Sequence, residues 1–195
     1  MRLLAAVFVL IGMCGMAHAD PFELTFDQFR KALDQRIQDD TTDKSGGSLS
    51  TTKECEKSGN VYNCIFNDKG FQKSVAAFKK IDMINGAFTL KMLLSVEITD
   101  GKVSQIRLGG VKDDPANLFQ YTATVTNVMQ LFDPKIVDGE GNSLALMNEL
   151  GIMRGDGDPT TGSPLDVIKP YAGIRCLNVR TKIASTAVCQ WRPRS

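Results

Sequence analysis

Asp156 and Asp158 are the best candidates for acid–base chemistry in this sequence. They flank Gly157 in a loop over 154–164 that is rich in Gly, Asp, Pro and Thr, and paired carboxylates can hydrolyse glycosidic bonds without histidine. Aspartate beside glycine is also the usual composition of a solvated turn. The turn is the simpler interpretation. A carboxylate-dependent hydrolase of envelope polymers is therefore an alternative function and not the favoured one.

Other catalytic patterns are absent or stand in an unsuitable context. The single histidine, His18, lies in a segment that we expect to be removed, which excludes imidazole mechanisms for the mature chain. Residues 50–53 have the S-x-x-K spacing of penicillin-recognising serine enzymes, but they precede an expected strand, and no S-D-N or K-T-G follows. No nucleotide-binding pattern occurs. We therefore expect no cofactor and favour a protein without catalytic activity.

A calcium-binding pattern begins at Asp138 but is incomplete. Glu140, Asn142 and Glu149 follow at positions 3, 5 and 12 of an EF-hand count, where oxygen ligands are needed. Position 6 requires glycine for its sharp turn and is Ser143 instead. The sequence favours a turn in which Asn142 or Ser143 caps a short helix, and we expect no metal site.

Charge is unevenly distributed along the chain. Residues 167–195 contain six basic residues and no acidic one, whereas residues 20–166 contain 16 basic and 22 acidic residues. Arginine binds carboxylates and phosphates in a bidentate manner, and a neighbouring tryptophan can anchor a contact. The predicted binding residues are Arg175, Arg180, Lys182, Trp191 and Arg192. The alternative interpretation is a solvated strand face with the tryptophan in the core.

The first nineteen residues have the pattern of a cleaved signal peptide. Arg2 precedes an apolar run over 3–16, which is followed by an Ala-His-Ala cleavage site before Asp20. The apolar run is shorter than the ~20 residues that a membrane-spanning helix needs. Cleavage leaves 20–195 as a single domain without a transmembrane segment, in the periplasm or outside the cell. The sequence has no Asn-x-Ser/Thr site, which favours a bacterial protein.

Removal of the signal segment leaves four cysteines, an even number that indicates two disulfides. If residues 59–60 form a two-residue turn, the strand register that extends from this turn places Cys55 opposite Cys64 at a non-hydrogen-bonded site. The Cα atoms at such a site are about 4.5 Å apart, within the range that a disulfide can bridge. Cys176 and Cys189 lie on two β-rich runs. This predicts a second local bridge, whose register the spacing does not fix.

Two long helices are predicted over 26–38 and 117–132. Thr25 and Gln28 form a capping box before the first helix, and Asp114 followed by proline opens the second. Apolar residues recur every three or four positions in both. The apolar stripe of the second helix is therefore predicted to face the core.

The central strands are predicted around an Asp-Gly turn at 100–101. The runs 88–99 and 102–108 flank this turn and alternate apolar and polar residues, so we expect their hairpin at the centre of the sheet. A short helix is expected over 144–150. The segment 71–81 fits a helix or a strand, and its flanking turns favour a strand.

Together these elements predict an α+β domain, in which an antiparallel β-sheet carries two main helices on one face and includes two disulfide-stapled β-hairpins. The favoured function is a non-catalytic binding or inhibitory module whose cationic C-terminal hairpin contacts an anionic envelope component or an acidic protein. Nucleic acid is not expected to bind a chain with a formal net charge of +1. A second alternative is a structural component of an envelope assembly, which oligomerises through the apolar stripe over 118–132 or through sheet edges.

Overall fold

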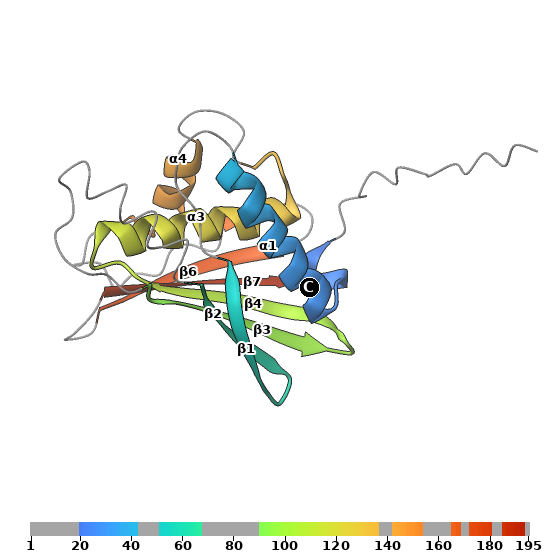
Figure 1. Ribbon diagram of the computed structural model, residues 1–195. Helices are drawn as coiled ribbons and strands as arrows, with labels where there is room; N and C mark the ends of the chain where they lie inside the picture. The colour runs from blue at the N-terminus through green and yellow to red at the C-terminus, as the bar shows by residue number, and fades with distance from the viewer. Residues whose placement is uncertain are drawn as a thin grey trace, which may run out of the picture.

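The computed structural model describes residues 20–42, 51–67, 90–136, 142–153, 165–168, 172–180 and 185–193. Within them a seven-stranded antiparallel sheet carries the main helices on one face (Figure 1). In their order across the sheet, the strands are β1 (Thr52–Ser58), β2 (Val61–Phe66), β3 (Met92–Thr99), β4 (Lys102–Val111), β7 (Ser185–Pro193), β6 (Ala172–Arg180) and β5 (Leu165–Ile168). The helices are the short 3₁₀ helix η1 (Pro21–Glu23), α1 (Phe26–Thr42), α3 (Pro115–Phe132) and α4 (Asn142–Glu149). The predicted α+β fold is confirmed.

The capping box before α1 forms as predicted. The Thr25 backbone N–H and hydroxyl donate to Oε1 of Gln28 at 3.0 and 3.1 Å, and the Gln28 N–H donates to the Thr25 hydroxyl at 3.4 Å. The apolar residues that follow at helical spacing are fully buried: Phe29, Leu33 and Ile37. The helix continues to Thr42, beyond the predicted end at 38, because neither glycine nor proline interrupts the polar residues that follow.

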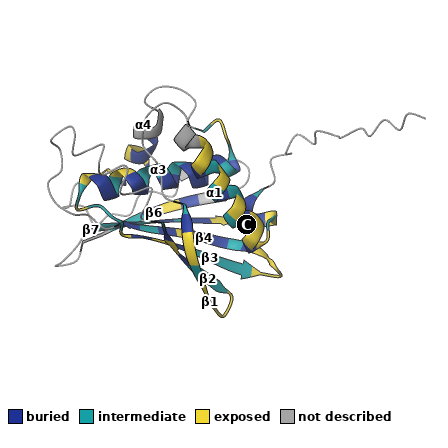
Figure 2. Cartoon of the chain, viewed as in Figure 1, coloured by how far each residue is buried: buried dark blue, intermediate teal, exposed yellow. Residues whose placement is uncertain are grey.

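α3 is enclosed over most of its surface. Oδ1 of its N-cap, Asp114, accepts a hydrogen bond from the Asn117 N–H at 2.8 Å, and Pro115 occupies the first turn. Eleven of its eighteen residues are buried, and Figure 2 shows α3 above the sheet, largely in the colours of buried and intermediate residues. The stripe over 118–132 therefore packs in the core, as predicted. The alternative in which this stripe forms an oligomerisation surface is wrong.

β3 and β4 form the predicted central hairpin. Asp100 and Gly101 have positive φ angles of 51° and 77°, the conformation that a type I′ turn requires, and Thr99 pairs with Lys102. These strands are the third and fourth of the seven. Each therefore has a hydrogen-bonded neighbour on both sides, with β2 beside β3 and β7 beside β4.

Tyr121 fastens α3 to the sheet. Its side chain is fully buried, and its hydroxyl donates to the Leu108 carbonyl at 3.3 Å and lies 3.2 Å from Sγ of Cys189. Burial raises the pKa of this phenol far above its usual value. The ring also lies against Gly110, where an added Cβ would stand 2.3 Å from Cδ2 of the tyrosine. Glycine is therefore needed for the helix to approach the strand this closely.

Both predicted disulfides are present. Cys55 is bonded to Cys64 across β1 and β2, and Cys176 to Cys189 across β6 and β7, with the Cα atoms 4.0 Å apart in each bridge. The two pairs are also direct cross-strand partners in their hairpins. Three of the four cysteines are buried in the core, whereas Cys55 is half-buried.

Some predictions concern residues that lie outside the described part of the chain. Among them are the signal segment 1–19, the segment 71–81 and the loop 154–164. The predicted short helix is present as α4 and begins at Asn142 rather than at 144. None of the described helices is long and apolar enough to cross a membrane.

Candidate functional site

Trp191 lies in the core and not on the surface. None of its side chain is exposed, and its cross-strand partners, Ile106 of β4 and Ile174 of β6, are buried too. Adjacent residues of a strand point to opposite faces, so Trp191 does not share a patch with the exposed Arg192. The tryptophan is therefore removed from the predicted binding surface, and the alternative interpretation, a core residue, holds.

Arg175 of β6 and Arg192 of β7 are exposed on the face of the sheet opposite the described helices. Arg175 pairs with Gln190, and Arg192 follows Gln190 by two positions, so the three side chains share this face. The buried Cys189 alternates with them and contacts Tyr121 of α3 on the other face. Two of the five predicted residues thus lie together.

The remaining two predicted basic residues are Arg180 and Lys182. The backbone of Arg180 pairs with Ser185 at the end of the hairpin where β7 begins. The side chain of Arg180 and all of Lys182 lie outside the described residues. Both residues remain predictions.

Arg107 of β4 is a third exposed arginine on the same face, and the sequence reasoning missed it. It pairs with Gln190 of β7, which in turn pairs with Arg175 of β6. Since neighbouring strands lie about 4.8 Å apart, the backbones of Arg107 and Arg175 are separated by about 10 Å. We call Arg107, Arg175 and Arg192 the arginine face.

None of the three side chains of the arginine face forms an ion pair with another described residue. Nε of Arg192 donates to Oε1 of Gln105 at 2.7 Å, which orients its guanidinium without neutralising it. Guanidinium groups offer planar, bidentate donors that match carboxylate, phosphate and sulfate groups. The arrangement is therefore chemically suited to holding an anionic group of another molecule.

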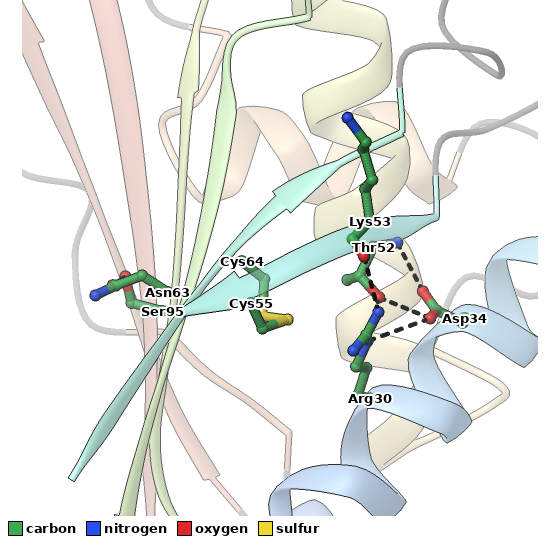
Figure 3. The surroundings of a disulfide bond; sticks show 8 residues. All are labelled: Arg30, Asp34, Thr52, Lys53, Cys55, Asn63, Cys64 and Ser95. Carbon is green, nitrogen blue, oxygen red and sulfur yellow. Dashed lines mark hydrogen bonds and ion pairs between the residues drawn. A yellow bond between two sulfur atoms is a disulfide. The ribbon is translucent and has the colours of Figure 1, made fainter. Parts of the chain in front are cut away.

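Carboxylates lie towards the other end of the same sheet face. Glu56 of β1 is exposed and pairs with Asn63 of β2, and Glu97 lies on β3 two positions from Ser95. The Ser95 hydroxyl donates to Oδ1 of Asn63 at 2.7 Å, and Figure 3 shows these two side chains on the opposite side of the sheet from Asp34 and α1. The face is thus divided, with carboxylates on β1 and β3 and arginines on β4, β7 and β6.

An apolar row crosses this face beside the arginines. Cross-strand pairing aligns Ile65, Leu93, Gly109, Val188 and Leu177, one residue from each strand between β2 and β6. Ile65 and Leu93 are 44% and 46% exposed. Exposed apolar side chains next to arginine are typical of macromolecular interfaces, so the surface has two kinds of group available for contact.

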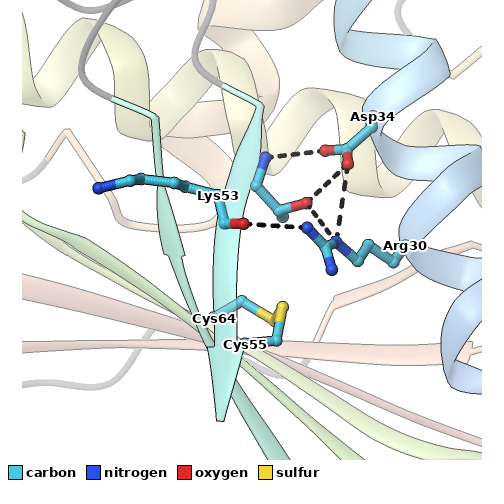
Figure 4. A network of polar contacts seen from close by, with 6 residues as sticks. Arg30, Asp34, Lys53, Cys55 and Cys64 are labelled. Atoms are coloured by element: carbon cyan, nitrogen blue, oxygen red, sulfur yellow. Dashed lines mark hydrogen bonds and ion pairs between the residues drawn. A yellow bond between two sulfur atoms is a disulfide. The ribbon is translucent and has the colours of Figure 1, made fainter.

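A separate polar cluster joins α1 to β1 near the first disulfide (Figures 3 and 4). Asp34 accepts from the Thr52 N–H at 2.8 Å and from its hydroxyl at 2.6 Å, and Nε of Arg30 donates to that hydroxyl at 2.9 Å. Arg30 also donates to the Lys53 carbonyl at 3.1 Å, while Nζ of Lys53 lies 3.5 Å from a carboxylate oxygen of Glu54. Thr52 and Lys53, two residues of the S-x-x-K pattern, therefore connect α1 to the edge strand β1. The serine of the pattern lies outside the described residues.

The sequence offers four further candidates for acid–base chemistry or metal binding. Asp156, Asp158, Asp138 and Glu140 lie outside the described residues, and within the described ranges no three His, Cys, Asp or Glu residues are grouped so that they could hold a metal ion. Comparisons of the chain with protein-family models, with curated proteins and with solved structures found no match. The function is therefore inferred from the geometry of the site alone.

Proposed function

We propose that this protein is a non-catalytic binding or inhibitory module, exported to the periplasm or the medium, whose arginine face contacts an anionic envelope component or an acidic protein. The observation that carries the proposal is the juxtaposition of Arg107, Arg175 and Arg192 on one sheet face, without an ion pair to another described residue. Two disulfides support a place in an oxidising compartment. The removal of the first nineteen residues is part of this proposal.

The site is well prepared for recognition because its backbone is held before a partner arrives. The three arginines project from adjacent strands, and the bridge between Cys176 and Cys189 links two of these strands. Ordering a mobile loop on binding costs free energy, which a strand face avoids. Binding should weaken as salt rises, because the attraction between exposed charges is screened.

Charge reversal tests the proposal. Purified, processed protein is immobilised and used to capture partners from the envelope fraction of its source cells, in parallel with the variant Arg107→Glu/Arg175→Glu/Arg192→Glu. We expect a partner that the wild type retains and the variant loses, because carboxylates repel the anionic group that guanidiniums bind. If the captured partner is an enzyme, loss of its activity on addition of the protein identifies inhibition.

A second variant controls for net charge. Lys31→Glu/Lys57→Glu/Lys135→Glu changes the charge by the same amount at three exposed positions away from the arginine face. This control should retain the partner. Equal retention by the wild type and the arginine variant, or equal loss in both variants, would overturn the assignment of the arginine face.

A further inference from the structure

We infer that the sheet face opposite the described helices also docks a second copy of this chain, in a two-fold symmetric dimer. A symmetric dimer places one surface patch against the same patch of the other copy, so the patch must be complementary to itself. This face has three carboxylates, Glu54, Glu56 and Glu97, on one half and the arginines on the other. A surface divided in this way is complementary to a copy rotated by half a turn.

The two-fold axis that brings opposite charges together runs parallel to the strands, between β3 and β4. Rotation about this line exchanges β3 with β4, β2 with β7 and β1 with β6, because these six strands are neighbours in the order β1-β2-β3-β4-β7-β6. Residues of one cross-strand row then face residues of the same row in the second copy. Two equally twisted sheets related in this manner can stack in the aligned geometry of a β-sandwich.

The row that contains Arg107 becomes a row of complementary pairs. Cross-strand register aligns its members across six strands: Glu56, Asn63, Ser95, Arg107, Gln190 and Arg175. The rotation places Glu56 opposite Arg175 of the second copy, and symmetry forms this ion pair twice. It also places Ser95 opposite Arg107, where the serine hydroxyl oxygen can accept a hydrogen bond from the guanidinium.

The apolar row gives a second, independent match. The same rotation places Leu93 opposite Gly109 of the second copy and Ile65 opposite Val188. Within one copy, a Cβ added at Gly109 would make only ordinary contacts, the nearest at 3.7 Å from Cγ2 of Val188, so packing inside a single chain does not require glycine there. A leucine from a facing copy does require glycine at position 109, because the leucine side chain occupies the space that a side chain there would fill.

The dimer and an anionic partner would compete for the arginine face. This consequence rests on the proposed function, whereas the dimer itself does not, because it forms from this chain alone. Glu56 of the second copy would occupy Arg175 until a more strongly binding anionic partner displaced it. Self-association would thus regulate access to the binding surface.

Charge exchange tests the dimer. Sedimentation velocity and light scattering over a range of protein concentrations should give twice the mass of one chain for the wild type. Glu56→Arg and Arg175→Glu should each raise the dissociation constant about 100-fold, because the symmetric dimer contains the pair twice and each broken charge pair costs about tenfold. The combination Glu56→Arg/Arg175→Glu should restore the dimer, since the charges are exchanged rather than removed.

Further variants complete the test. Glu149→Arg, at an exposed position of α4, should stay dimeric, and circular dichroism should show that every variant is folded. A monomeric wild type, single variants that remain dimeric, or a combination that stays monomeric would each overturn the dimer. The proposed function is tested separately, because Glu56→Arg keeps all three arginines and should still capture the anionic partner as a monomer.

Discussion

Gly110→Ala should destabilise the fold far more than Gly109→Ala at the neighbouring position of β4. A Cβ at Gly110 would lie 2.3 Å from Cδ2 and 2.7 Å from Cγ of Tyr121, whereas a Cβ at Gly109 would meet its nearest atom at 3.7 Å. The two substitutions make the same chemical change in the same strand. Their difference therefore measures how closely α3 packs on the sheet.

The magnitude follows from the displacement that the tyrosine ring must make. The ring has to move by roughly 1 Å to restore van der Waals contact distances, and overpacking of this kind costs about 1–3 kcal/mol. The movement also weakens the hydrogen bond to the buried Leu108 carbonyl, which adds about 1 kcal/mol. We expect Gly110→Ala to lower the free energy of unfolding by about 2–4 kcal/mol, and Gly109→Ala to change it by less than about 1 kcal/mol.

Tryptophan fluorescence supplies the assay. Trp191 is the only tryptophan and is fully buried, so its emission reports the loss of the core during denaturant unfolding. The measurement is made on dilute protein, so that self-association does not contribute to stability. In a Tyr121→Ala background, Gly110→Ala should cost about 1 kcal/mol or less, because the ring is gone and only the contact with Cβ at position 121, at 3.1 Å, remains. Equal effects of the two alanine substitutions, or an unchanged cost without the tyrosine ring, would refute the reasoning.

Two further predictions concern the disulfides and the buried phenol. Under native conditions a reductant should open the Cys55–Cys64 bridge before the Cys176–Cys189 bridge. The reason is that Cys55 is half-buried, whereas both cysteines of the second bridge lie in the core. Timed alkylation and mass spectrometry give the order of reduction, and simultaneous reduction of the two bridges would contradict the prediction. Above pH 10 the free energy of unfolding should fall with pH in the wild type more steeply than in Tyr121→Phe, by up to about 1.4 kcal/mol per pH unit. The reason is that burial raises the pKa of Tyr121 in the folded chain, whereas unfolding exposes the phenol, which then ionises. The contribution is fully present below pH 10, and parallel pH profiles of the two proteins would show that the phenol is not the cause.

Features that depend on nearby residues could be predicted from the sequence. The capping box at Thr25, the N-cap at Asp114 and the pairing of Cys55 with Cys64 each involve groups within ten residues of one another. The geometry of a helix end or a two-residue turn fixes such contacts without reference to the rest of the chain. These predictions were confirmed for that reason.

The position of Arg107 on the site could not be predicted in the same way. Its place between the apolar residues Ile106 and Leu108 identifies it as an outward-facing strand residue. Its position next to Gln190 and Arg175 depends on the pairing of β4 with β7, and these strands are far apart in the sequence. Local spacing contains no information about such a pairing.

The predicted exposure of Trp191 was wrong for a reason that lies in the sequence itself. Trp191 and Arg192 are adjacent in a strand, so their side chains point to opposite faces. Once Cys189 is bonded to Cys176, the tryptophan two positions further on must lie on the same face as this buried bridge. The two-residue period of a strand, applied strictly, therefore separates Trp191 from the exposed arginines.

The strand order has a consequence for how the chain folds. β4 pairs on one edge with β3, which directly precedes it, and on the other edge with β7, the last of the described strands. During synthesis the middle of the sheet therefore keeps an open edge until β7 has emerged, and pairing across so long a separation is slow. In an exported chain, as we propose, this delay keeps the sheet from closing before its final strand is available.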